Sequence, residues 1–212
     1  LLDSIYENPK IDWDSRETSW NFQQNELIKH NRKSLSEAFA FYQKYWSNKF
    51  FELLRNEEII NKQFIEIYDL QSEVTPDVRL EEISILQEEA KIESGELHIE
   101  PFPVLLQFLS YSVGCIFGRF SLDKQGLILT NQRDAFHDFL KQVPNPSFTP
   151  DEDNIIPVLD GEWFKDDIVG RFKVFLKAAF GEEYFEENLN YIEDVIGKDI
   201  RKYFVKDFYN DH

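Results

Sequence analysis

The longest regular pattern in the chain is a stripe of apolar residues that begins after Ser34 and continues to about Leu70. Apolar side chains recur there at steps of three and four, which is the spacing of one face of an α-helix. Ser34 and Glu37 form the pattern of a capping box, and no proline or glycine interrupts the segment that follows. The pattern predicts one helix that spans about 55 Å. The stripe comprises residues 35, 39, 42, 46, 50, 53, 60, 64 and 67.

A helix of this length exceeds what a small domain needs, so we expect it to serve as a connector. Its stripe is not a strict heptad of aliphatic residues. This favours packing on neighbouring helices of the same chain over a coiled-coil dimer.

The segments on either side of this helix carry weaker patterns. Residues 1–33 are expected to form an arm, with turns at Asn8-Pro9 and at residues 12–15. Residues 78–85 are expected to be extended or a short strand, and residues 87–100 an acidic surface loop. The expected packing anchors of the arm are Trp13, Trp20 and Phe22.

Residues 104–118 predict a buried helix that carries Ser110, Gly114 and Gly118 on one face. Small residues spaced by four allow another backbone to approach closely, so we expect a tight helix crossing there. The turn after this helix precedes a possible short strand at residues 127–130.

Four prolines between residues 142 and 160 predict a long loop that divides two lobes. Three helices are then expected, at about residues 166–180, 182–196 and 199–209, with glycines at the ends of the first two. The fold class is therefore mainly α-helical, with one long connector helix and at most a few short strands. We expect three parts: an arm (1–33), a connector helix (34–72) and a compact, mainly helical domain (73–212).

Composition narrows the function classes. The net charge is −17, and each third of the chain is acidic. DNA affinity depends largely on Lys and Arg that neutralise phosphates, so the chain alone is a poor DNA binder. The acidic surface is either simply solvated or docks on a basic partner surface. The chain has no apolar run of membrane-spanning length and no signal-peptide pattern, so we expect a cytoplasmic protein.

The motifs that carry chemistry are largely missing. No glycine-rich phosphate loop occurs, and the four histidines are not spaced as a ligand pair. The acidic run at residues 151–154 lacks the spacing of a calcium loop and is interpreted as solvated. Cys115 is expected to be an inert core thiol. We therefore assign no catalytic, cofactor-binding or metal-ligating residue.

Arg119 is the one side chain to which we assign alternative roles. It follows the apolar helix, where it would cap backbone carbonyls or pair with a carboxylate. Alternatively, it contacts a DNA phosphate, with nearby Lys124 as a second candidate.

Five blocks of sequence resemble, in the same order, the region after the catalytic domain of PglX-type adenine-specific DNA methyltransferases. These enzymes belong to BREX phage-defence systems and are similar to type IIG restriction-modification enzymes. The blocks are Ser15-Arg-Glu-Thr-Ser-Trp-Asn-Phe22, Glu57 to Pro76, Ser110 to Asp123, Asp151 to Pro157 and Tyr203 to Tyr209.

The resemblance implies that the parent protein transfers a methyl group from S-adenosylmethionine to adenine N6. The catalytic motif and cofactor glycines of the family have no counterpart here, so the chain is expected to be a non-catalytic piece without a cofactor of its own. It would space the catalytic and target-recognition parts, and the full-length bacterial protein would bind DNA. Its partners would be other domains of the polypeptide and other defence subunits. The alternative is an acidic helical module that docks a partner subunit or basic surface.

Overall fold

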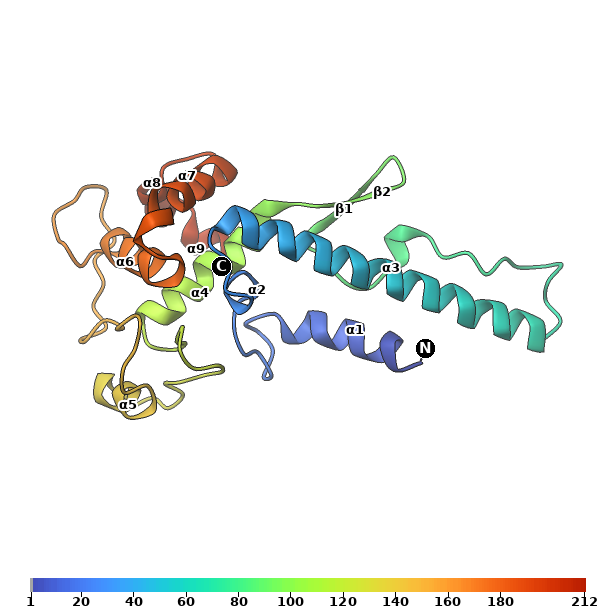
Figure 1. The fold of residues 1–212 in the computed structure, drawn as a ribbon, viewed down its shortest axis with the longest axis horizontal. Coiled ribbons are helices and arrows are strands. Elements are labelled where there is room, and N and C mark those ends of the chain that lie inside the picture. The colour runs from blue at the N-terminus through green and yellow to red at the C-terminus, as the bar shows by residue number, and fades with distance from the viewer. Residues whose placement is uncertain (1) are drawn as a thin grey trace.

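The computed structural model describes residues 2–212, and over these residues it is mainly α-helical, as predicted. Figure 1 shows a long helix, α3, that leaves a cluster of helices and projects along the long axis of the molecule. The sheet in the described chain has two strands, β1 and β2. The α-helices are α1 (Leu2–Asp14), α2 (Glu26–Lys29), α3 (Leu35–Ile67), α4 (Pro101–Ile116), α5 (Phe136–Gln142), α6 (Ile168–Phe180), α7 (Phe185–Ile196), α8 (Ile200–Lys206) and α9 (Phe208–Asp211).

Helix α3 confirms the long helix expected after Ser34. The Ser34 side chain accepts a hydrogen bond from the backbone N–H of Glu37, as an N-cap residue does. The backbone N–H of Leu35 donates to Asn188 Oδ1 of α7 over 2.7 Å, so a distant helix also caps this end.

The apolar stripe of α3 is buried only in its first half. The prediction that the whole stripe packs within the chain is wrong for positions 64 and 67, where Phe64 and Ile67 are exposed. Local periodicity defines the face of a helix, but other elements must be present to cover that face. The buried residues of α3 are Leu35, Ala38, Phe39, Tyr42, Trp46, Phe50 and Leu53.

Helix α1 occupies part of the expected arm and runs antiparallel to α3 (Figure 1). Pro9 lies inside this helix, so the turn expected at Asn8-Pro9 is absent. Ile5 and Ile11 pack on the core, and this packing offsets the cost of an interior proline. The prediction that Trp13 and Trp20 anchor the arm is wrong, because both side chains are exposed. Of the three expected anchors, only Phe22 is buried.

The segment after α3 forms a hairpin that the sequence reasoning took for a loop. Strands β1 (Ala90–Glu93) and β2 (Glu96–Ile99) pair antiparallel around Ser94-Gly95. Both turn residues have positive φ, at 53° and 80°, which is the geometry of a tight two-residue hairpin. Residues 78–85 form no strand; they contain one 3₁₀ turn, η1 (Leu80–Glu82).

Helix α4 begins at Pro101. Prolines are tolerated in the first turn of a helix, because the backbone amide groups there have no partner within the helix.

Helices α6, α7 and α8 agree with the three helices expected at the end of the chain, and a second 3₁₀ turn, η2 (Glu182–Tyr184), precedes α7. Gly181 and Gly197 end the first two with φ of +88° and +69°.

The middle of the chain differs more from expectation. Residues 127–130 form no strand; Ile128 instead packs with Phe139 and Val143 in a small second core beside α5. Helix α5 itself was not predicted. Residues 143–160 are irregular, as expected for the proline-rich loop.

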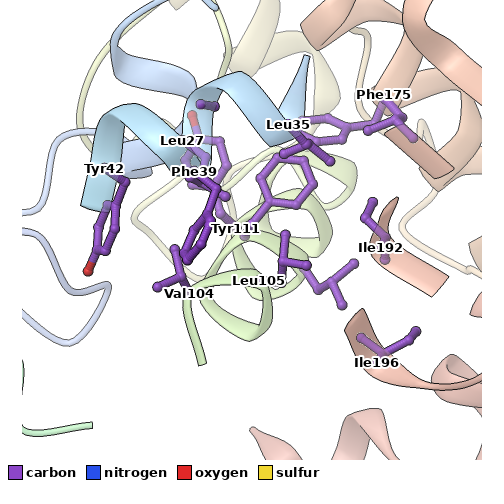
Figure 2. Close-up of a cluster of buried hydrophobic side chains, with 14 of the residues drawn as sticks. Leu27, Leu35, Phe39, Tyr42, Val104, Leu105, Tyr111, Phe175, Ile192 and Ile196 are labelled. Atoms are coloured by element: carbon purple, nitrogen blue, oxygen red, sulfur yellow. The ribbon is translucent and has the colours of Figure 1, made fainter. Parts of the chain in front are cut away.

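The main core joins α3 and α4 to the helices near the end of the chain. In Figure 2, Leu35 and Phe39 of α3 lie close to Leu105 and Tyr111 of α4. Figure 2 also shows Phe175 of α6 with Ile192 and Ile196 of α7 on the far side of this cluster. Because one end of α3 is held in this core, the direction of the projecting end is fixed relative to the helical cluster.

Candidate functional site: a polar cavity beside the core

A buried ion pair connects α1, the hairpin and α4. The guanidinium of Arg16, just after α1, donates to both carboxylate oxygens of Glu89 over 2.8 and 2.9 Å. Glu89 is only 2% exposed and also accepts a hydrogen bond from Gln107 of α4. Asp12 lies 3.5 Å from the same guanidinium. Removing Arg16 would leave the buried carboxylates of Asp12 and Glu89 without their shared cation, which is strongly destabilising.

A cavity of about 250 Å³ lies beside this ion pair. Phe22 and Leu106 contribute apolar surface to its lining, and Glu17, Gln107 and Ser110 contribute polar groups. Its lining comes from the loop after α1, from α4 and from the last residues of the chain, so tertiary folding alone creates it.

Glu17 is the most unusual group in the cavity. Ser110 Oγ donates to Glu17 Oε2 over 3.3 Å, while Glu17 Oε1 is buried and has no hydrogen-bond partner in the described structure. Burial raises the pKa of Glu17 from 4.5 to about 7, although Ser110 and the charge of Arg119 act in the opposite direction. The cavity therefore offers a carboxyl group that changes charge near neutral pH and can accept a hydrogen bond from a donor or a cation.

The structure places Arg119 at the end of α4, on the surface. Its backbone N–H donates to Gly114 O over 2.8 Å, and its carbonyl accepts from Ile128 over 2.9 Å. Its guanidinium lies 5.5 Å from the centre of the Phe120 ring. Arg119 is close enough to Glu17 to lower the pKa of that carboxyl.

Lys124 is exposed and donates to Gln142 Oε1 of α5 over 2.8 Å. The contacts of Lys124 and of Arg119 are made to different residues, so their shared role in binding DNA stays a prediction.

The three small residues of α4 have separate roles. Gly114 leaves room for the Phe120 ring, since a Cβ atom there would lie 2.5 Å from Phe120 Cδ2. Gly118 lies after the helix with φ of +70°, against Leu129. Ser110 lines the cavity. The expected crossing by another helix backbone is therefore replaced by a ring from the turn that follows α4.

The described residues contain no group of three or more His, Cys, Asp or Glu side chains arranged to hold a metal ion. Cys115 is buried, and burial raises the pKa of its thiol well above its usual range. A thiol that resists ionisation is a poor nucleophile. Among residues 2–212, no helix is both long enough and apolar enough to cross a bilayer.

Sequence reasoning missed the pairing of Arg16 with Glu89 and the position of Glu17. Arg16 and Glu17 lie in the block 15–22 and Ser110 and Arg119 in the block 110–123, so both blocks had been singled out. Nothing in the order of residues shows that Glu17 and Ser110, which lie 93 positions apart, line one cavity.

The fold and the cavity together define an acidic, helical segment whose long helix extends beyond its own core. Comparison with known proteins identifies the larger proteins that contain such a segment. The chain is 33% identical over 227 residues to the adenine-specific methyltransferase PglX of Lacticaseibacillus casei (strain Zhang). It is 30% identical over 230 residues to the adenine-specific methyltransferase BrxX of Escherichia coli O9:H4 (strain HS).

Both matches cover 100% of this chain but only 18% and 19% of the two relatives. No protein-family model matches the chain. Over its whole length, the chain is thus related to part of the PglX-type adenine-specific methyltransferases, and it spans about a fifth of the length of these relatives.

Proposed function

We propose that the chain is a non-catalytic spacer in an adenine-specific DNA methyltransferase of a BREX-type defence system, located downstream of the catalytic domain. In this proposal the parent protein uses S-adenosylmethionine to methylate adenine N6 and binds the DNA. The observation that supports the spacer role most directly is the geometry of α3, a 33-residue helix held in a core at one end and projecting at the other.

A helix of this length spans about 50 Å, a distance comparable to the width of a domain. Its N-terminus is capped by Ser34 and Asn188, and seven of its residues are buried in the core. No proline or glycine interrupts it, so it has none of the usual causes of a kink. Such a helix sets both a distance and an orientation between the core at its start and any other part of the parent that packs against its projecting end.

Contact with DNA is secondary in this proposal. A chain with a net charge of −17 is repelled by phosphates, so affinity must come from other parts of the parent. Arg119 and Lys124 are exposed cations at the surface and are the positions at which a local phosphate contact could form.

The spacer role is tested by inserting residues into α3 of the full-length parent between Asn61 and Lys62, where the helix is exposed. Two inserted alanines rotate the projecting end of α3 beyond Asn61 by about 200° relative to the core, whereas seven rotate it by about 700°, close to two full turns. We expect the two-residue insertion to abolish methylation of target DNA and to leave binding of S-adenosylmethionine unchanged. The seven-residue insertion should retain more activity because it restores the orientation.

Matched insertions into the irregular segment at residues 151–154 serve as the control and should be tolerated. Unchanged methylation by both α3 variants would exclude the spacer role. Methyl transfer by the isolated chain would also exclude it.

The cavity supports a second candidate function, an acidic module that docks a basic partner subunit. Glu17 lines the cavity together with the apolar side chains of Phe22 and Leu106, which suits a Lys or Arg side chain with its apolar stem and charged head. Capture of a basic defence subunit by the chain, weakened by Glu17→Gln and by high salt, would favour this function. Capture that is insensitive to both changes would count against it.

A further inference from the structure

The projecting end of α3 carries an apolar surface that the described chain leaves uncovered. Phe64, Ile67 and Tyr68 are 54%, 73% and 67% exposed, and Ile59 and Val74 are exposed as well. We call these five residues the distal patch. The end of α3 and the segment that returns from it, which carry these residues, project away from the helical cluster (Figure 1).

The distal patch is built on an ordered support. After α3 the chain reverses, and the Leu70 N–H donates to Ile65 O over 3.0 Å. Asn61 Nδ2 donates to Pro76 O over 3.3 Å and holds the returning segment against the helix. The rings of Phe64 and Tyr68 stack at 6.4 Å with an interplanar angle of 16°. The hydrogen bonds fix the reversal, so the patch has a defined shape.

A groove of about 260 Å³ lies within this support, between α3 and the returning segment. Its walls are formed mainly by Phe64, Tyr68, Leu70 and Val74. This volume is large enough to receive one bulky apolar side chain. Burying such a side chain removes its apolar surface from water, which stabilises a complex. Phe64, Tyr68 and Val74 of the distal patch line this one groove, and grouped apolar surface of this kind commonly marks an interaction site.

The charges around the distal patch indicate the chemistry of its partner. The segment from Arg55 to Glu82 contains eight acidic and three basic residues. A second copy of the chain would place like charges against each other, and DNA would be repelled. The matching surface therefore has an apolar centre and a rim of Lys and Arg.

The length of the relatives indicates where this surface is found. The chain matches PglX and BrxX over its whole length but covers only about a fifth of each, so most of such a protein lies outside this segment. We propose that the distal patch docks on another part of the same parent polypeptide, which inserts an apolar side chain into the groove and surrounds it with basic residues. This inference rests on the proposed function, because it takes the chain to be part of a larger methyltransferase.

The proposal is tested by photo-crosslinking in the full-length parent. Phe64 is replaced by the photoreactive analogue benzoylphenylalanine, and crosslinked peptides are identified by mass spectrometry. We expect a crosslink within one polypeptide, to a Lys- or Arg-rich peptide outside residues 1–212. The same analogue at Val158, which is similarly exposed but lies in the loop before α6, should not crosslink to that peptide.

Three results would overturn the proposal: a crosslinked species of twice the monomer mass, crosslinks confined to residues 1–212, or no crosslink from position 64. Hydrogen exchange provides a second measurement. The double substitution Phe64→Ser/Ile67→Ser should increase exchange in the partner peptide at least about threefold. The matched control Ile155→Ser/Val158→Ser should leave that exchange unchanged, and an equal effect of both pairs would contradict docking.

The docking and spacer proposals can fail separately. Docking without spacing would give the crosslink while the α3 insertions leave methylation intact. Spacing without docking would give loss of methylation on insertion while position 64 shows no crosslink.

Discussion

At the scale of single residues, Glu17 combines burial with incomplete hydrogen bonding. One carboxylate oxygen accepts from Ser110, and the other has no partner in the described structure. Burying an ionised group under these conditions is unfavourable, so the carboxyl retains its proton to a higher pH. The pKa of about 7 makes this residue a source of pH-dependent stability.

We predict that Glu17→Gln removes part of that pH dependence. Between about pH 4.5 and pH 7 the folded chain binds this proton more tightly than the unfolded chain, so the free energy of unfolding falls as pH rises through this window. Above pH 7 the variant should be more stable than the unmodified chain, by at most about 3 kcal/mol. Urea unfolding at pH 5 and pH 8 measures the effect. Glu96→Gln, at an exposed position, should leave the slope unchanged, and an unchanged slope in Glu17→Gln would contradict the prediction.

A second prediction concerns Gly114. Replacing glycine by alanine inside a helix normally stabilises it by about 1 kcal/mol, but here the new Cβ would overlap the Phe120 ring. That ring is buried and stacks on Tyr111 at 5.3 Å, so it has little freedom to move. We expect Gly114→Ala to lower the free energy of unfolding by about 1–3 kcal/mol. In the background of Phe120→Leu the same change should be milder, and a neutral or stabilising Gly114→Ala would exclude this packing.

At the scale of elements, α3 shows one sequence pattern in two environments. Phe50 and Phe64 continue the same apolar stripe, yet Phe50 is buried and Phe64 is exposed. The helix remains regular through both halves because its backbone hydrogen bonds are local. Burial of its first half depends on α1, α2 and α7, which contact α3 and join its start to the core.

We predict that Asn188 on α7 is required to stabilise the start of α3. Its Oδ1 accepts the Leu35 N–H, and both residues are buried, so removing the acceptor leaves a buried donor unpaired. Asn188→Ala should lower the free energy of unfolding by about 1–3 kcal/mol. Asn190→Ala, two positions away and exposed, is the matched control and should have little effect. Equal unfolding free energies for the two variants would show that Ser34 alone caps the helix.

At the scale of the whole molecule, charge is the dominant property. The net charge of −17 is spread along the chain, and most ion pairs in the described structure have at least one exposed partner. Exposed pairs contribute little to stability, whereas repulsion among many like charges acts against the compact state. The buried pair of Arg16 and Glu89 is much less sensitive to dissolved salt.

We therefore predict that salt stabilises the chain. Raising NaCl from about 0.02 M to about 0.3 M shortens the screening length several-fold. The melting temperature should increase by roughly 2–4 °C, which corresponds to about 1 kcal/mol for a chain of this size. Thermal unfolding followed by circular dichroism measures the change, with a neutral osmolyte as the control. A lower melting temperature in salt would show that favourable ion pairs outweigh the repulsion.

The sequence alone determined the features that depend on neighbours within about four positions. These include the course of α3 from its cap at Ser34, the ends of α6 and α7 at glycines, and the strong negative charge. Each follows from backbone hydrogen bonds, turn conformations or composition, which are properties of short segments. The local pattern at Asn8-Pro9 predicted a turn, but Pro9 lies inside α1. The packing of this helix outweighs the preference of proline for a turn.

Only the tertiary structure decided which apolar and charged groups are buried. It covered Phe50 and left Phe64 exposed, paired Arg16 with Glu89, and brought Ser110 to Glu17. None of these outcomes is encoded in a local pattern, because each depends on contacts between segments far apart in the chain. The candidate cavity and the distal patch both arise in this way, from side chains that distant elements cover in one place and leave uncovered in another.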